Sequence, residues 1–208
     1  ARLASLPCVR RICEIGFNAG HSAVGWLAAN DRAEVLAFDL FDGEPGPAAA
    51  GLLYGGQGPS SGLSELRADR RLRIVEGSST ETLPVVFTDD DDPVYCDLLV
   101  VDGGHQRQVA ASDIAGFRRL ARPGFHLLVI DDVYCDAYWC LGPTRAAQDA
   151  LDAGLIDGPL AVRTMRHRDP DHANARTDDG TIALRGMAVF QYRGVATQAT
   201  TQDRTDMS

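Results

Sequence analysis

Short apolar runs alternate with helix-like segments along most of the chain. This alternation predicts successive βα units and a mainly parallel sheet. The apolar runs are almost continuous, as expected for strands that are covered on both faces. Strands are predicted at seven ranges, Arg11–Ile15, Glu34–Phe38, Leu72–Val75, Asp97–Val101, His126–Ile130, Leu160–Met165 and Met187–Tyr192. The predicted fold class is therefore α/β, a Rossmann-like doubly wound sheet of seven strands.

Helical spacing and polar composition complete the predicted organisation. Helices are expected at Ser22–Ala29, Leu63–Arg70, Gln106–Ala121 and Thr144–Ala153. The Gly-, Ala-, Pro- and Ser-rich segment Gly43–Ser61 is either a lid over a ligand or a plain surface insertion. The polar stretch His167–Gly180 is expected to be a loop. We expect one domain over residues 1–193 and a disordered tail over residues 194–208, which have little apolar content.

The charge balance limits the classes of partner. The net charge of -9 argues against a nucleic-acid backbone or an anionic membrane surface as partner. All 20 basic residues are Arg, which excludes a lysine base and a lysine Schiff base from the chemistry.

The cysteines predict a reducing compartment. There are five of them, an odd number, and no pair is spaced as CxxC, so neither a disulfide framework nor a zinc site is expected. Cys13 and Cys96 lie in or beside predicted buried strands, where thiols usually pack as small apolar groups. The expected location is the cytoplasm.

A glycine-rich turn follows the first predicted strand and opens a helix. Gly16 and Gly20 allow a sharp turn and a close approach of the backbone to a ligand. Their G-x-x-x-G spacing lacks the G-x-G-x-x-G fingerprint of dinucleotide enzymes. Asp39 ends the second strand, where a carboxylate can accept the hydroxyls of a ribose, although it could instead serve a turn. Together these features predict a nucleoside-type ligand.

Acidic residues end two further predicted strands. Asp102 ends the fourth strand, and Asp131 and Asp132 end the fifth. Carboxyl ends of parallel strands open on one crevice, so the three carboxylates are expected to converge and to favour a hard cation, Mg²⁺ first and Mn²⁺ or Ca²⁺ next. His105 lies three residues past Asp102 and is the candidate general base. Helix capping, solvated turns and a half-buried histidine are the structural alternatives.

Three segments resemble the motifs of class I S-adenosylmethionine-dependent methyltransferases. Glu14 to Ala23 (EIGFNAGHSA) is similar to motif I, and Val35 to Asp39 (VLAFD) is similar to the second motif, which ends in the ribose-binding acid. Glu76 to Ser79 (EGSS) is similar to the adenine-side motif, although Ser78 stands where Asp is commoner. The resemblance implies a late antiparallel strand and binding of S-adenosylmethionine by Glu14, Gly16, Phe17, Asn18, Gly20, Ser22, Asp39, Gly77, Ser78 and Asp102.

The segments Asp102 to His105 (DGGH) and Ile130 to Asp132 (IDD) resemble metal-dependent O-methyltransferases of small molecules and sugars. This resemblance implies a metal at Asp102, Asp131 and Asp132 and a base at His105. The expected function is methyl transfer to a hydroxyl of a small molecule or sugar, with homo-oligomerisation left open. The alternatives are a metal-independent N- or carboxyl-methyltransferase, a nicotinamide-dependent oxidoreductase, or a catalytically silent scaffold.

Overall fold

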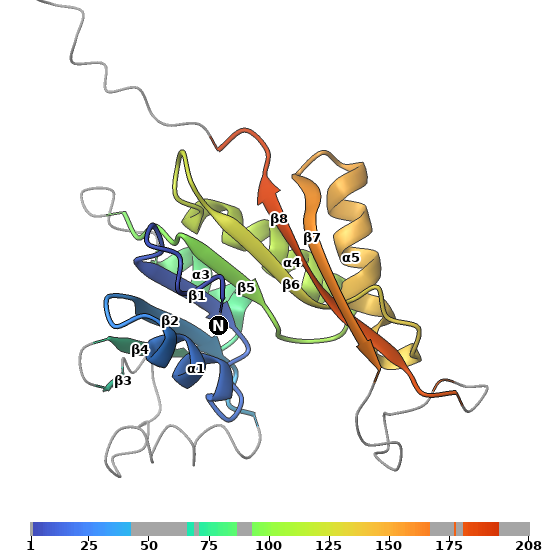
Figure 1. Cartoon of the computed structure of the whole chain (residues 1–208), viewed down its shortest axis with the longest axis horizontal. Helices are drawn as coiled ribbons and strands as arrows, with labels where there is room; N and C mark the ends of the chain where they lie inside the picture. The colour runs from blue at the N-terminus through green and yellow to red at the C-terminus, as the bar shows by residue number, and fades with distance from the viewer. Residues whose placement is uncertain are drawn as a thin grey trace, which may run out of the picture.

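A computed structural model describes residues 2–42, 66–68, 71–86, 93–166, 177 and 181–195. Within them, one eight-stranded sheet has the order β3-β4-β2-β1-β5-β6-β8-β7 (Figure 1). The strands are β1 (Arg11–Ile15), β2 (Glu34–Asp39), β3 (Leu66–Ala68), β4 (Leu72–Glu76), β5 (Leu98–Val101), β6 (Leu127–Val133), β7 (Ile156–Arg166) and β8 (Leu184–Tyr192). The five strands β4, β2, β1, β5 and β6 are parallel to their neighbours in this series. The short edge strand β3 is antiparallel to β4, and β8 is antiparallel to both β6 and β7.

Helices cover both faces of this sheet. They are α1 (His21–Ala29), α3 (Ser79–Val86), α4 (Arg107–Phe117) and α5 (Leu141–Asp152), with 3-10 turns η1 (Arg118–Leu120) and η2 (Tyr138–Cys140). Helices α3, α4 and α5 pack their apolar side chains on one face of the sheet. Helix α1 and the N-terminal turns pack on the other face (Figure 1). The chain runs from β1 outward to β2 and β4 and then returns to β5 on the other side of β1. The carboxyl ends of β1 and β5 therefore form the switch point where ligands bind in this type of sheet.

The doubly wound, mainly parallel fold is confirmed, and all seven predicted strands are present, with β8 as the antiparallel strand. The helix expected over Leu63–Arg70 is wrong, because Leu66–Ala68 forms the additional strand β3 by pairing with β4. Helix α3 was not predicted, since Pro84 inside it is a residue that normally ends a helix. Helix α5 begins before Thr144, at Leu141, because a proline is tolerated in the first turn.

The cysteines also differ from expectation. Cys13 on β1 and Cys96 just before β5 form a disulfide across neighbouring parallel strands, and Cys135 pairs with Cys140. The first pair joins residues that are 83 positions apart, a proximity that sequence spacing cannot reveal. Cys8 is exposed and unpaired.

Several sequence expectations lie outside the described residues. They are the proposed lid Gly43–Ser61, most of the polar stretch from His167 to Gly180, and the tail beyond Val195. Among the residues that the structure does describe, no helix has the length and apolar character needed to cross a bilayer.

Candidate active site

The glycine turn is built by close contact between the ends of β1 and β5. Gly16 has φ 97°, and a Cβ added there would lie 2.0 Å from the carbonyl oxygen of Asp102. The Gly16 N–H donates to the Phe38 carbonyl at 2.9 Å, and the Asp102 N–H donates to the Ile15 carbonyl at 2.9 Å. Glycine is therefore required at position 16 both by the backbone angle and by the space available.

Asp39 ties the second strand to this turn. One carboxylate oxygen accepts the Asn18 N–H and the other accepts the Phe41 N–H, both at 2.8 Å. Asn18 and Phe41 have positive φ angles, so the carboxylate holds two left-handed residues in place. An ionised carboxylate has about four acceptor positions, so Asp39 retains capacity for ligand hydroxyls.

Glu14 lies beneath the turn and is fully buried. The Ser22 hydroxyl donates to its Oε1, while its Oε2 is buried without a hydrogen-bond partner. Burial raises the pKa of Glu14 to about 8; the Ser22 hydrogen bond opposes this change, and the charges of Asp102 and Asp39 add to it. A buried acid that holds its proton up to such a pH is costly to ionise.

A cavity of about 680 Å³ opens at the switch point. This volume suits a ligand of small-molecule or cofactor size. The predicted site residues that line it are Gly16, Asn18, Asp39, Gly77, Ser78, Asp102 and His105. The other predicted cofactor residues do not line it: Glu14, Phe17, Gly20 and Ser22 shape the turn instead.

The cavity also includes a pair of residues that sequence reasoning missed. The Ser79 hydroxyl at the start of α3 donates to Asp113 Oδ1 on α4 at 2.5 Å, while Asp113 Oδ2 is buried without a hydrogen-bond partner. Burial raises the pKa of Asp113, and the Ser79 hydrogen bond partly offsets this change. The available signal was a carboxylate on the apolar stripe of a predicted helix, between Ala110 and Phe117.

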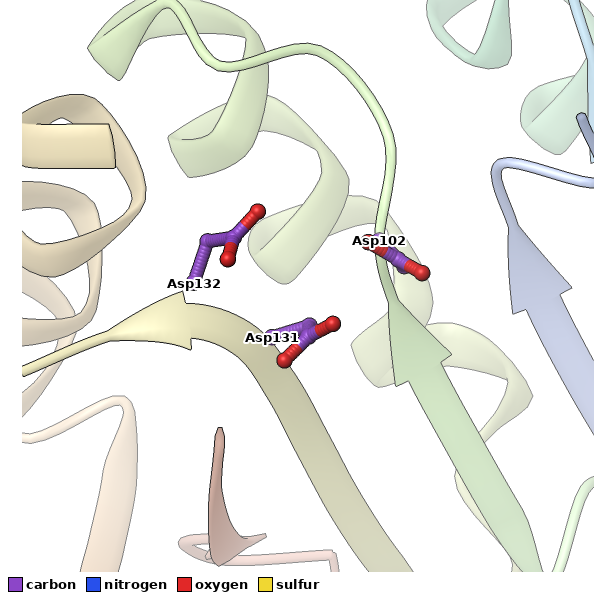
Figure 2. A group of neighbouring side chains, drawn as sticks. All are labelled: Asp102, Asp131 and Asp132. Atoms are coloured by element: carbon purple, nitrogen blue, oxygen red, sulfur yellow. The ribbon is translucent and has the colours of Figure 1, made fainter. Parts of the chain in front are cut away.

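Three carboxylates converge beside this cavity, as Figure 2 shows. Asp102, Asp131 and Asp132 each offer one oxygen within 4.8 Å of the others. Consecutive strand residues normally point to opposite faces. Here Asp132 has φ 54°, and the β6–β8 register shifts between Ile130 and Val133, so both adjacent aspartates reach the same crevice.

Burial and the neighbouring negative charges disfavour ionisation of Asp102 and Asp131. The Asp102 side chain lies at the edge of the cavity, but the surrounding protein atoms desolvate it. This desolvation raises the pKa of Asp102 to about 7, and the charges of Asp131 and Asp132 add to the effect. Burial and the charge of Asp132 also raise the pKa of Asp131. Such a cluster binds either protons or cations near neutral pH.

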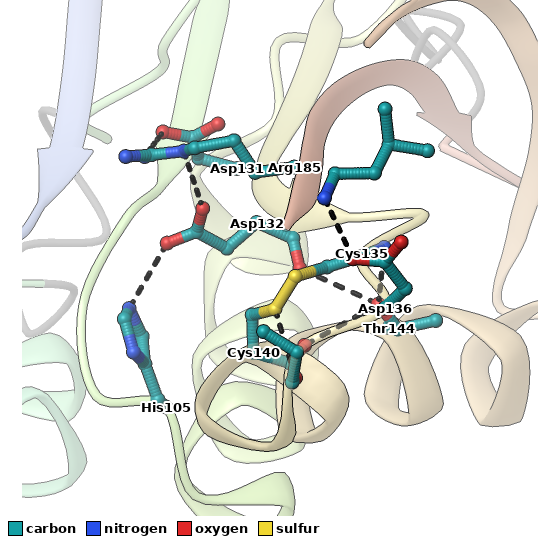
Figure 3. The surroundings of a disulfide bond; sticks show 10 residues. His105, Asp131, Asp132, Cys135, Asp136, Cys140, Thr144 and Arg185 are labelled. Carbon is teal, nitrogen blue, oxygen red and sulfur yellow. Dashed lines mark hydrogen bonds and ion pairs between the residues drawn. A yellow bond between two sulfur atoms is a disulfide. The ribbon is translucent and has the colours of Figure 1, made fainter. Parts of the chain in front are cut away.

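A histidine and an arginine contact the carboxylates (Figure 3). His105 Nε2 lies 3.1 Å from Asp132 Oδ2, and this contact raises the pKa of His105 against the opposing effect of burial. The ring of His105 also packs against Trp139, with centroids 5.4 Å apart. Arg185 on β8 lies beside Asp131 and Asp132, and nothing in the sequence singles out this arginine among the 20.

Helix α5 supports the loop that carries His105. A Cβ at Gly142 would lie 1.9 Å from the His105 carbonyl oxygen, so α5 begins in direct contact with this loop. Arg107 at the start of α4 pairs with Asp149 on α5 through two contacts of 2.7 Å. These contacts hold the loop that carries His105 against the start of α5, and the His105 ring points toward Asp132 (Figure 3).

Solved structures share this architecture at low sequence identity. A putative caffeoyl-CoA O-methyltransferase from Staphylococcus aureus is 14% identical with a TM-score of 0.57, over 92% of this chain and 78% of that one. Spermidine synthase from Thermotoga maritima is 14% identical with a TM-score of 0.53, over 93% of this chain and 56% of that one. The MycE methyltransferase of the mycinamycin biosynthetic pathway, solved with Mg and S-adenosylhomocysteine, is 18% identical with a TM-score of 0.51. That match covers 89% of this chain and 45% of the MycE chain.

No curated protein matches the sequence. The family described as a methyltransferase domain, however, matches residues 13–133, more than half of the chain. This span runs from the glycine turn to the end of β6 and thus contains Asp39, Asp102, His105 and both adjacent aspartates. The chain belongs to this methyltransferase-domain family and is a class I S-adenosylmethionine-dependent methyltransferase.

Proposed function

We propose that the chain transfers the methyl group of S-adenosylmethionine to a hydroxyl of a small molecule or sugar, and that a divalent cation, Mg²⁺ first, assists. The observation that carries the proposal is the convergence of Asp102, Asp131 and Asp132 at the edge of the cofactor cavity. Asp102 and His105 line that cavity, so the cluster adjoins the predicted cofactor site.

The donor set fits a hard divalent cation. All three proposed ligands are carboxylates, the type of oxygen ligand that Mg²⁺ prefers. Asp132 is only 4% exposed, and its Oδ1 has no hydrogen-bond donor. The Arg185 Nε lies 3.0 Å from this oxygen without a hydrogen bond to it, so one buried oxygen remains able to take a cation directly. When bound, the cation would orient the acceptor hydroxyl and make its proton more acidic.

The protein's own residues would supply binding and proton transfer. Asp39 and the glycine turn would hold the ribose and methionine parts of the cofactor. His105, packed on Trp139 and in contact with Asp132, would accept the proton from the acceptor hydroxyl. Displacement at a methyl group requires in-line placement of the two reactants, so positioning would supply much of the rate.

One observation favours a second candidate, a metal-independent N- or carboxyl-methyltransferase. Arg185 already pairs with Asp131 and Asp132 and partly neutralises them without a metal, and His105 Nε2 lies 3.1 Å from Asp132. The reason for preferring the metal-assisted reaction is that three converging carboxylates face only one permanently charged side chain, Arg185.

Methyl-transfer assays with a panel of hydroxylated small molecules and sugars test the proposal. Turnover should fall at least about tenfold with a chelator and return when Mg²⁺ is restored. Binding of S-adenosylhomocysteine should persist in the chelated protein, which would separate loss of the cation from loss of the cofactor site. Turnover that is insensitive to chelation would favour the metal-independent reaction.

A further inference from the structure

Arg185 contacts two of the three proposed cation ligands (Figure 3). Its terminal nitrogen lies 3.4 Å from Asp131 Oδ2, and its Nε lies 3.0 Å from Asp132 Oδ1. The guanidinium also lies over the ring of Trp139, 5.8 Å from the ring centroid. Among the described residues, these aspartates are the acidic groups with which Arg185 pairs.

The contact with Asp132 provides charge but not a hydrogen bond. Although Nε is only 3.0 Å from Oδ1, that oxygen has no aligned donor. A hydrogen bond weakens steeply when its donor is misaligned, so this pair is held mainly by Coulomb attraction. A divalent cation carries twice the charge of a guanidinium and can take the same oxygen directly.

The charges also balance only when both cations are counted. With His105 neutral, as a general base must be, the three carboxylates carry about three negative charges when ionised and Arg185 supplies one positive charge. One divalent cation would neutralise the two negative charges that remain. Without a metal, the guanidinium forms ion pairs with Asp131 and Asp132. It would repel a divalent cation that binds to the same carboxylates.

We propose that Arg185 is a positioning residue that sets the affinity of the cation site, because it occupies Asp131 and Asp132 and must give up Asp132 Oδ1 for a divalent cation to bind. This inference rests on the cation site of the proposed function. It adds that the site is tuned to bind its cation more weakly than the three aspartates alone would.

Mn²⁺ binding to the full chain, measured by calorimetry without cofactor or acceptor, tests the inference. Arg185→Gln should bind Mn²⁺ about tenfold more tightly than the wild type, since one positive charge next to the ligands is removed. Arg185→Lys keeps the charge but cannot span both carboxylates as a planar fork, so its affinity should be intermediate. Arg32→Gln removes an equal charge from an exposed position just before β2, at the amino ends of the parallel strands and opposite the aspartates, and should leave the affinity unchanged.

The outcomes separate this inference from the proposed function. Binding to the wild type with equal or weaker binding to both Arg185 variants would overturn the role of Arg185 and leave the cation site intact. No Mn²⁺ binding to the wild type or to either variant would overturn both. If Arg185→Gln does not fold, Arg185→Lys decides alone, because a purely structural arginine would not give tighter binding on replacement by lysine. Melting temperature and S-adenosylhomocysteine affinity serve as readouts of intact folding.

Discussion

Glu14 should make the stability of the protein fall as the pH rises. Folding moves its pKa from 4.5 to about 8, mainly through burial. The unfolded chain releases this proton near pH 4.5, whereas the folded protein keeps it up to about pH 8. The stabilising effect of Glu14 is therefore fully present below pH 4.5. It declines steadily between the two pKa values and is lost as the pH rises through 8. The change from pH 5 to pH 8 is about 3–4 kcal/mol, from the linkage relation with one pKa unit equal to about 1.4 kcal/mol.

Glu14→Gln removes this titration. The amide cannot ionise, so the free energy of unfolding of the variant should lack this part of the pH dependence. Its amino group would face the buried space where Glu14 Oε2 has no partner, which costs about 1–3 kcal/mol at every pH. The informative quantity is therefore the difference between the wild-type and variant slopes and not the difference at one pH.

Urea denaturation at pH 5, 6, 7 and 8 measures both slopes. Glu34→Gln is the matched control, since Glu34 is exposed and its ion pair with Arg11 lies at the surface. The control should follow the wild type. Parallel stability curves for the wild type and Glu14→Gln would refute the reasoning, because they would mean that Glu14 does not retain its proton in the folded state.

The remaining predictions concern the turn, the base and the cation. Gly16→Ala should weaken S-adenosylhomocysteine binding at least about tenfold in calorimetry, because the added Cβ meets the Asp102 carbonyl, while Gly25→Ala, with nothing within 4 Å of its Cβ, should bind normally. His105→Gln should keep cofactor affinity and lose about 10²–10⁴-fold in turnover together with the acidic limb of the pH–rate profile; near-normal turnover would make His105 structural. Mn²⁺ affinity should rise from pH 5 to pH 8, because Asp102, with a pKa of about 7, must lose its proton to bind a cation, and a flat profile would remove Asp102 from the ligand set.

The parallel strands were predictable because each is buried on both faces and therefore reads as an apolar run. The predicted strand Arg11–Ile15 coincides with β1, and the positions of Asp39 and Asp102 followed from the strand ends. Edge elements were less predictable. Strand β3 exists because it pairs with β4, not because its three residues favour a strand.

Site features that depend on contacts between distant residues could not be predicted. The strand ends predicted that Asp132 joins the crevice, but not that it does so through a positive φ angle and a register shift against β8. Arg185 meets Asp131 across 54 residues, and Ser79 meets Asp113 across 34. Such pairs arise from strand order and helix packing, so a single sequence without the fold gives no signal for them.

The central claim, a site for the methyl-donor cofactor at the glycine turn, is tested most directly by calorimetric titration with S-adenosylhomocysteine and, separately, with NADH. The account predicts that S-adenosylhomocysteine binds and NADH does not. Asp39→Asn, which keeps an acceptor oxygen for only one of the two N–H groups of Asn18 and Phe41 and loses the charge, should weaken the binding at least about tenfold. Binding of NADH without binding of S-adenosylhomocysteine would contradict the account.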